Sequence, residues 1–313
     1  MFVDNEVFLE THEAPRFDIF TLRDVNPVSK NVKTRKISNP NPSMREIHRR
    51  IIQAIGDIYT YPLNFFDSPY ENASRHVNSR YFYQTDLKNA YSSVPLERLA
   101  NILVSLEPKW KLDEVRETLA RYCFEKSGMG LIVGAPASPK LFNIYAWQTI
   151  DILLAEFWPY MNDRGRIFGK QYSRYLDDLT FSSPELITDG VRRMIRQVIE
   201  RAGFQVNHRK SAVLDLKKGP VVITGVGLEY RSNKSARLFL PRHYLKRMNG
   251  LLHLAIKGDS RVSHSQVEGL MGVFHGVLGR KYEHSNEIIK FNATEEKFLD
   301  VHQLYQARYS KRC

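Results

Sequence analysis

The sequence predicts an α+β fold in which acidic residues lie at the ends of strands. Three observations predict this fold. From residue 81 to about 240, short runs of aromatic, β-branched and apolar residues alternate with amphipathic, helix-like stretches. One of these runs, 81–87, carries the acid Asp86 near its end. Two adjacent acids, Asp177 and Asp178, lie where a hairpin would turn.

The composition is strongly basic, with a formal net charge of +12 and a pI of about 9.6. This charge favours a polyanionic partner, most often nucleic acid, although an acidic membrane surface attracts it as well. We expect no membrane span and no secretory signal, because no run of about 18 apolar residues is present and the N-terminus lacks the charge pattern of a signal. Only two cysteines, Cys123 and Cys313, are present, which fits a reducing, cytoplasmic setting.

The N-terminal part predicts one helix and then a strand. Residues 1–42 show little periodicity. Ser43 and Glu46 have the spacing of a capping box, so Ser43 is expected to cap a helix that ends near Gly56. The aromatic residues of 81–87 favour a strand.

Turn and helix signals then divide the rest of the chain. Pro95 is typical of a helix start. The Gly/Pro-rich stretch 128–139 predicts a loop, and the apolar run behind it predicts a helix at about 140–157. Gly203 is expected to end the helix that follows the hairpin. The remaining expected elements are a helix at about 112–125, short strands within 204–240 and basic helices from 241 onward.

The adjacent acids need a physical explanation, because two like charges at a tight turn repel each other. A pair of divalent metal ions would compensate Asp177 and Asp178, as in the two-metal sites that join nucleotides. The alternative is a turn exposed to water. Asp86 can supply a ligand from a second strand, so that Asp86 and Asp177 bridge two ions about 3.5–4 Å apart. Taken by itself, Asp86 is better interpreted as an ordinary turn residue at the end of a strand.

Four segments together resemble the motifs of reverse transcriptases. Tyr175-Leu176-Asp177-Asp178 resembles their Tyr-x-Asp-Asp box, and residues 86–96 resemble their first palm motif, with the acid and Tyr91 five positions apart. Residues 134–139 are similar to their glycine-rich second motif, and 203–211 to the segment after the catalytic hairpin. All four occur in the family's order.

Shorter segments narrow the resemblance to bacterial retron-like and defence-associated members. Asn72-Ala73-Ser74-Arg75-His76 is similar to the Asn-Ala-x-x-His box of retron enzymes, and Ile223-Thr224-Gly225 to their Val-Thr-Gly box. Residues 240–244 also resemble bacterial members. Other bacterial defence reverse transcriptases share parts of these boxes, and the resemblance spans roughly residues 30–260.

The resemblance implies a right-hand polymerase with an antiparallel palm sheet and a helical thumb. It assigns 1–80 to an N-terminal segment and fingers, 81–235 to the palm with finger insertions, and 236–313 to the thumb and C-terminal tail. It implies RNA-directed DNA synthesis from dNTPs with two Mg²⁺ ions, for which Mn²⁺ can substitute. It also implies a noncoding RNA template, an RNA–DNA product, a role in anti-phage defence and an effector protein as an optional partner. The sequence leaves the oligomeric state open.

The resemblance also implies roles for individual residues. Tyr91 would lie under the incoming sugar and exclude a 2′-hydroxyl, with a packed tyrosine as the alternative. Arg35, in a segment similar to the family's Arg-x-Ile, would bind the triphosphate, and Lys210 would protonate or neutralise the pyrophosphate, unless both are solvated surface charges. The residues assigned to metal binding and catalysis are Asp86, Asp177 and Asp178; those assigned to the nucleotide are Arg35, Lys36, Tyr91, Gly134, Ala135, Pro136 and Lys210; those assigned to RNA or DNA are Asn72, His76, Arg45, Arg49, Tyr175, Arg242 and Lys246.

Two of these assignments carry an open choice, and two positions depart from the family. Asn72 and His76 share a face if helical and would make an RNA contact or a packing contact, not a catalytic one.

Val133 replaces the glutamine that most members place before the second motif, and valine donates no side-chain hydrogen bond. Ala137 replaces a common threonine. The alternatives are therefore a weakly templated or protein-primed DNA polymerase and an inactive RNA-binding scaffold.

Overall fold

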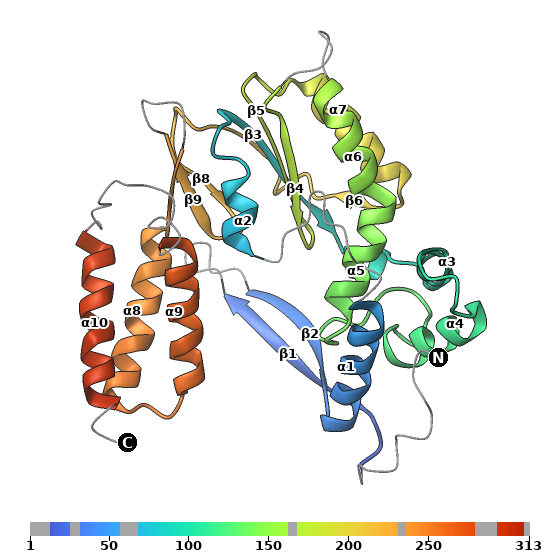
Figure 1. Ribbon diagram of the computed structural model, residues 1–313, viewed down its shortest axis with the longest axis horizontal. Coiled ribbons are helices and arrows are strands. Elements are labelled where there is room, and N and C mark those ends of the chain that lie inside the picture. Colours follow the sequence, from blue (N-terminus) through green and yellow to red (C-terminus); the bar gives the residue numbers. More distant parts are fainter. Residues whose placement is uncertain are drawn as a thin grey trace.

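The computed structural model describes residues 13–25, 32–56, 68–161, 168–230, 236–278 and 293–309 (Figure 1). Its centre is a five-stranded antiparallel sheet. Strand β3 (Tyr81–Lys88) pairs with β5 (Asp178–Ser183) on one side and with β6 (Gln205–Val206) and β7 (Ala212–Asp215) on the other, and β4 (Gln171–Tyr175) pairs with β5. The α+β prediction and the strand that carries Asp86 are confirmed.

Alternating side chains of β3 enter two different hydrophobic cores. Phe82 packs in one core with the C-terminal helices, whereas Tyr83 and Leu87 pack in the other with the helices on the opposite face. This alternation is what a strand buried on both faces requires. The helices that share the core of Tyr83 and Leu87 are α1 (Pro42–Gly56), α3 (Leu96–Leu106), α4 (Leu112–Tyr122), α5 (Ser138–Ala146), α6 (Ile152–Phe157) and α7 (Asp189–Arg201).

The expected helix at 140–157 is interrupted. A π-helical turn, η3 (Trp147–Asp151), separates α5 from α6, and a 3₁₀ turn, η4 (Trp158–Tyr160), follows. A π turn inserts one extra residue per turn and shifts the direction of the side chains behind it. Here it brings Asp151 into the interior beneath β4, where the residue is almost fully buried.

The C-terminal part is a small sheet with a helical bundle. Strands β8 (Val221–Ile223), β9 (Val226–Glu229) and β10 (Arg237–Phe239) form an antiparallel sheet in the order β10-β9-β8. Helices α8 (Arg242–Lys257), α9 (His264–Leu278) and α10 (Ala293–Tyr309) lie side by side beyond it (Figure 1). The short helix α2 (Pro69–Ser74) contacts β8 and β9, so it links this part to the central sheet.

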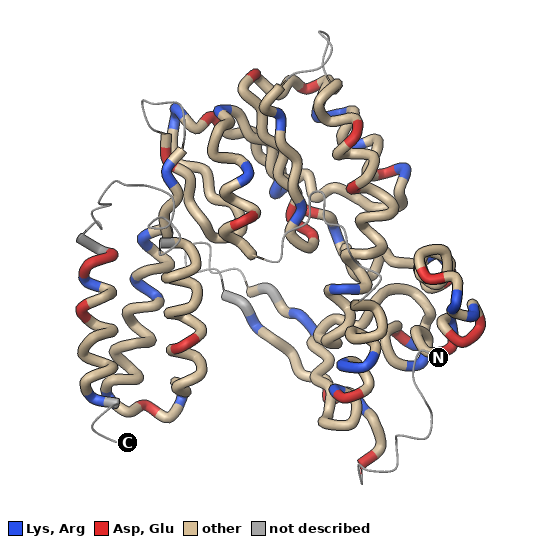
Figure 2. Tube along the Cα trace, in the orientation of Figure 1, with Lys and Arg blue, Asp and Glu red and all other residues tan. Residues whose placement is uncertain are grey.

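Basic residues lie on several elements of the molecule (Figure 2). Helix α7 carries four arginines along its 13 residues, and α8 carries Arg242, Lys246 and Arg247 in its first half. Within the described part of the chain, no helix has the length and apolar character needed to cross a membrane.

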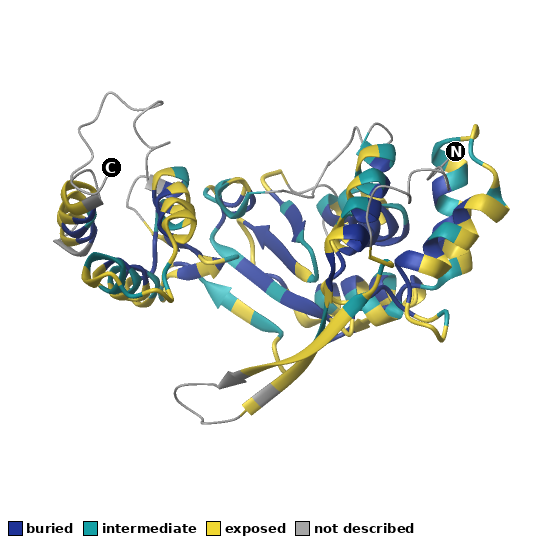
Figure 3. Cartoon of the chain, turned by 90° about the horizontal axis from the view of Figure 1, so that it is seen from below, coloured by how far each residue is buried: buried dark blue, intermediate teal, exposed yellow. Residues whose placement is uncertain are grey.

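The N-terminal described segment forms a two-stranded ribbon that projects from the body (Figure 3). Its strands are β1 (Phe17–Val25) and β2 (Val32–Pro40), and helix α1 (Pro42–Gly56) follows. The helix ends at Gly56 as predicted, but Ser43 is not its cap. The Oδ1 of Asn41 accepts hydrogen bonds from the backbone N–H of Met44 and of Arg16, because the helix begins two residues earlier than the Ser43–Glu46 spacing indicated.

Candidate active site

The hairpin β4–β5 and strand β3 place the three acids at one edge of the central sheet. Asp178 pairs with Tyr175 across the hairpin, which leaves Leu176 and Asp177 at its tip. Asp178 also lies opposite Asp86 in the register of β3 and β5. The backbone N–H of Leu87 donates to the carbonyl of Asp177 over 2.9 Å. The predicted hairpin and the predicted neighbourhood of Asp86 are both present in the structure.

The Asp86 carboxylate is 5% exposed and binds a lysine. Its Oδ2 accepts from the Nζ of Lys210 at 2.5 Å and from the Nδ2 of Asn207 at 3.4 Å. The turn after β6 holds Lys210 in reach, because the backbone N–H of Asn207 donates to the carbonyl of Asp86. The hydrogen bond to Asp86 raises the pKa of Lys210, so this side chain stays protonated. Lys210 therefore lies beside the acids, and its role at the pyrophosphate stays a prediction.

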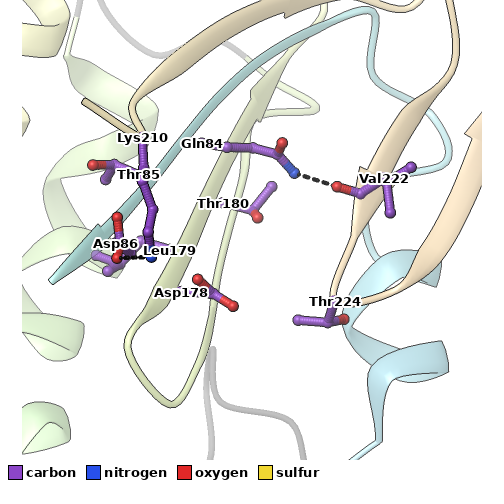
Figure 4. Close-up of a pocket in the computed structure, with 9 residues that line it drawn as sticks. All are labelled: Gln84, Thr85, Asp86, Asp178, Leu179, Thr180, Lys210, Val222 and Thr224. Atoms are coloured by element: carbon purple, nitrogen blue, oxygen red, sulfur yellow. Dashed lines mark hydrogen bonds and ion pairs between the residues drawn. The ribbon is translucent and has the colours of Figure 1, made fainter. Parts of the chain in front are cut away.

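A pocket of about 190 Å³ opens between these acids and the β8–β9 turn (Figure 4). Asp86 is turned toward Lys210, and Asp178 lies between them and Thr224. Gln84 donates to the carbonyl of Val222 and closes the far side of the pocket. The lining residues are Gln84, Thr85, Asp86, Asp178, Leu179, Thr180, Lys210, Val222 and Thr224.

The donor set of this edge suits a hard divalent cation, because carboxylate oxygens are the ligands that Mg²⁺ prefers. The Oδ1 of Asp86 is buried and has no hydrogen-bond partner in the structure, so one oxygen is left for a cation. Among the described residues, however, no three His, Cys, Asp or Glu side chains converge as a metal cluster. The other oxygen of Asp86 accepts the hydrogen bond from Lys210.

Desolvation and the two neighbouring acids raise the pKa of Asp178 to about 6. Desolvation of its carboxyl contributes most, followed by the charges of Asp177 and Asp86, while Lys210 acts in the opposite direction. Such a group is poised to change its charge when a cation or a proton arrives.

We expect Asp178→Asn to stabilise the fold in buffer without divalent cations. The folded-state pKa lies above the ordinary value of 3.8, so the wild-type protein loses stability as the pH rises from about 4 to about 6 and then stays level. The stability advantage of the variant should therefore grow across that window. Thermal melts of both proteins at pH 4.5 and pH 7.5 check this, and an equal shift at both pH values would contradict it.

Tyr91 lies beside the acids and is fixed from two sides. Its ring stacks on Phe142 with 5.2 Å between centroids. Burial, and then the charge of Asp177, raise the pKa of Tyr91 to about 12, so the phenol stays neutral. Its carbonyl accepts from the N–H of Leu131. The close approach of that loop requires Gly130, since a Cβ there would lie 2.6 Å from the Cα of Ser92.

The loop 134–139 packs against the basic ribbon. Ser38 of β2 donates to the carbonyl of Val133 over 2.9 Å, and a Cβ on Gly134 would lie 2.5 Å from the Ser38 carbonyl oxygen. Gly134 also has a φ of +104°, so both the lack of space for a Cβ and the backbone conformation require glycine here. Ala135 is buried and Pro136 is exposed, while Val133 points its side chain partly to solvent.

Some of the arginines and lysines predicted to contact nucleotide or nucleic acid are exposed, and others already bond to protein atoms. Arg35 and Lys36 are exposed on β2, next to Ser38, and the side chain of Lys33 lies outside the described part. Arg242 and Lys246 are exposed at the start of α8. By contrast, Arg49 forms an ion pair with Glu46 at 2.7 Å, and Arg45 donates to the carbonyl of Pro40. Tyr175 is half-buried beside the acidic turn.

Asn72 and His76 lie in the interior, where they bond to protein. The Nδ2 of Asn72 donates to the Oγ1 of Thr224 at 3.3 Å, which joins the two short boxes named above. The ring nitrogens of His76 lie 2.7 Å from Ser182 and Ser173, one hydroxyl on each strand of the acidic hairpin. Burial lowers the pKa of His76 to about 3, so the ring is neutral and can donate at one nitrogen and accept at the other. Of the two predicted roles, this geometry favours packing.

We expect His76→Ala to lower the free energy of unfolding by about 2–4 kcal/mol, because it removes two buried hydrogen bonds and opens a cavity. Urea unfolding checks this. His253→Ala, at an exposed position of α8, should change the value by less than about 0.5 kcal/mol. The prediction is wrong if both variants unfold at the same urea concentration as the wild-type protein.

Sequence reasoning missed the buried ion pair beneath the hairpin. Arg174 of β4 is fully buried and binds Asp151 with two hydrogen bonds to its Oδ2 and one to its Oδ1. The sequence offered one signal, because an arginine inside a strand between aromatic residues needs an acidic partner if it is buried. The sequence did not show which acid, because the π turn that presents Asp151 was not predictable.

Comparison with known proteins agrees with the motifs. Residues 27–228 match the family model described as "Reverse transcriptase (RNA-dependent DNA polymerase)". The chain is 26% identical over 290 residues to the Retron Ec83 reverse transcriptase of Escherichia coli, which covers 88% of this chain and 87% of that protein. It is 28% identical over 214 residues to the Retron Mx65 reverse transcriptase of Myxococcus xanthus, which covers 64% of this chain and 47% of that protein.

The length match differs between these relatives. The chain also aligns with the Retron Mx162 reverse transcriptase of Myxococcus xanthus, at 23% identity over 76% of this chain and 53% of that protein. It thus spans about half the length of the two Myxococcus proteins. Among solved structures, the apo telomerase of Candida tropicalis aligns with a TM-score of 0.49 at 9% identity, over 94% of this chain and 62% of that one. A telomerase of Candida albicans solved with a fragment of telomeric RNA aligns with a TM-score of 0.47 at 12% identity, over 99% and 62%.

Proposed function

Because the chain belongs to the reverse transcriptase family of RNA-dependent DNA polymerases, we propose that it synthesises DNA on an RNA template at the edge formed by Asp86, Asp177 and Asp178. The observation that carries this proposal is the register of β3 and β5, which sets Asp86 opposite Asp178 and next to the Asp177 turn. Acids from two separate strands are what a nucleotidyl-transfer site requires.

The proposed division of labour follows the right hand of the family. Residues 1–80 form the N-terminal segment and fingers, 81–235 the palm with finger insertions, and 236–313 the thumb and C-terminal tail. In this division, the exposed basic residues of β2 belong to the fingers, and α8 is the first helix of the thumb. The C-terminal helices share their hydrophobic core with β8, β9 and β10, so the proposed thumb packs directly on the last strands of the proposed palm.

Asp86 and Asp177 would hold the divalent cations, with Asp178 beside them. Mg²⁺, or Mn²⁺ in its place, supplies charge neutralisation at the primer hydroxyl and the triphosphate when bound. Lys210 is protonated while it is bound to Asp86. Once it leaves Asp86, its ammonium group can neutralise the departing pyrophosphate or donate a proton to it. Arg35 and Lys36 offer exposed cations to the triphosphate oxygens.

Tyr91 is proposed to select the sugar. Its ring is held by Phe142 and lies near Asp177, so a nucleotide that reaches the acids must pass over it. A rigid aromatic wall leaves no room for a 2′-hydroxyl. The backbone of 134–136, fixed against β2, would form the floor next to the incoming base.

The proposed substrate is a dedicated noncoding RNA, copied into an RNA–DNA product as part of anti-phage defence, with an effector protein as an optional partner. Similarity to three retron reverse transcriptases supports this narrower proposal. The net charge of +12 and the exposed basic side chains of α8 support an RNA partner.

Sequencing the nucleic acid that copurifies with the chain tests the narrower proposal. The expected result is one abundant RNA, joined or paired to DNA that is complementary to part of it. A second candidate, synthesis with little template guidance, is favoured by Val133, whose exposed side chain cannot hydrogen-bond a nucleotide. Repetitive DNA with no complement among the bound RNAs would support that second candidate and contradict the first.

A further inference from the structure

The guanidinium of Arg174 lies between the Asp177–Asp178 turn and the Tyr91–Phe142 stack. It lies in β4, two residues before Leu176 at the tip of the acidic turn. Its Nη1 donates to the carbonyl of Leu176 at 2.9 Å and to the Oδ1 of Asn143 at 2.7 Å. The guanidinium also lies 5.5 Å from the ring centroid of Phe142, the ring on which Tyr91 stacks. One side chain therefore touches both the acidic turn and the support of the proposed sugar filter.

The guanidinium is held in place by a matched set of acceptors. Nε and Nη2 bind the two oxygens of Asp151, with Nη2 at 2.7 Å, and Nη2 also reaches the carbonyl of Asn143 at 3.4 Å. Together with the two bonds of Nη1, every N–H of the arginine has an acceptor. The hydroxyl of Tyr172 donates to Asp151 at 2.7 Å, so the acid is fixed as well. A planar fork with five donors fits this site and an ammonium does not.

The contact to Leu176 has a local reason. Leu176 has a φ of +52°, a left-handed conformation that is unfavourable for a leucine because its Cβ approaches the following carbonyl oxygen. Such a conformation persists where the surroundings determine it. The hydrogen bond from Arg174 to the Leu176 carbonyl is a constraint of this kind, and Asp177 follows directly after it.

We propose that Arg174 is a positioning residue, which fixes the Asp177–Asp178 turn and the Tyr91–Phe142 stack relative to each other. The inference rests on the proposed function, because DNA synthesis at this site requires the acids and Tyr91 to keep fixed relative positions. A buried ion pair by itself is weak evidence for stability, and replacing both partners with neutral side chains of similar size is often tolerated. The pair can therefore be removed without removing the fold.

The test uses the double variant Arg174→Met/Asp151→Asn, which removes both charges together. We expect it to melt near the wild-type temperature and to bind primed RNA as well as the wild type does. We expect its kcat for dNTP incorporation to fall by about 10²-fold with little change in KM, the effect of a small displacement at the reacting centre. Its preference for dNTP over rNTP should fall in the same variant, because the sugar filter shares the anchor.

The matched control is Arg80→Met/Asp215→Asn, which removes the ion pair between Arg80, the residue before β3, and Asp215, the last residue of β7, at the other end of the same sheet. It should keep kcat and sugar preference. Arg174→Lys is the second variant, because it keeps the charge beside Asp151 but cannot reach every acceptor, and it should also lose kcat. If Arg174→Met/Asp151→Asn and Arg174→Lys both polymerise like the wild type, the inference is wrong.

A Mn²⁺ titration followed by electron paramagnetic resonance separates this failure from failure of the proposed function. It needs no turnover. A displaced turn should weaken Mn²⁺ binding in Arg174→Met/Asp151→Asn but not in the Arg80 control. If the wild type makes no DNA, the proposed function fails, and the Mn²⁺ affinities still decide the inference: equal affinities in all three proteins overturn it.

Discussion

Asp177→Asn is expected to lower kcat for DNA synthesis at least about 10³-fold while the protein stays folded and binds primed RNA. The loss should be of the size found when a group that stabilises transition-state charge is removed. The substitution changes the charge but keeps the shape, and the bond that ties this residue to β3 uses its backbone carbonyl, not its side chain. Single-turnover incorporation of one dNTP measures the effect.

The control for this loss is Asp215→Asn. Asp215 lies on β7 of the same sheet and pairs with Arg80, away from the acidic turn. It should keep activity within about threefold, as expected for a partly exposed ion pair. A variant Asp177→Asn with undiminished synthesis would remove the acidic turn from the chemistry. Undiminished biological activity without synthesis would instead support the RNA-binding scaffold.

Tyr91→Val is expected to admit ribonucleotides. The ratio of rNTP to dNTP incorporation should rise by about 10²-fold, the scale on which a pocket discriminates one hydroxyl by shape. The reason is steric, because the substitution removes the ring that stacks on Phe142 beside Asp177 and leaves the acids in place. Incorporation of matched rNTP and dNTP on the same primed RNA measures the ratio.

Tyr91→Phe is the matched control, since it keeps the ring and removes only a hydroxyl that stays protonated at neutral pH. Its sugar preference should equal that of the wild type. If Tyr91→Val retains full preference for dNTPs, the ring does not form the filter and Tyr91 is a packing residue.

The parts of the site that the sequence predicted are those with a local signature. Asp86 closes an aromatic strand, and Asp177–Asp178 sit between two β-prone runs, so strand periodicity alone placed them at strand ends. The expectation that Asp86 joins the acidic turn from a second strand came from the needs of a two-metal site, and the register of β3 and β5 sets Asp86 opposite Asp178. Gly134 was predicted from its motif, and the close approach of Ser38 gives its physical reason.

The parts that the sequence did not predict depend on long-range contacts. Nothing near Arg174 in the sequence names Asp151, since the two residues meet only through a π turn in a distant helix. The burial of His76 depends on two serines about a hundred residues away. Asn41 took the capping role expected of Ser43 because the ribbon sets where the helix begins.

Primer extension on RNA tests the central claim most directly. Purified protein, Mg²⁺, dNTPs and a set of primed RNA templates that includes its own neighbouring transcript should yield DNA complementary to the template, and the Asp177→Asn protein should yield none. Absence of complementary DNA on every template from wild-type protein that binds those RNAs would contradict the assignment of Asp86, Asp177 and Asp178 as the site of RNA-directed DNA synthesis.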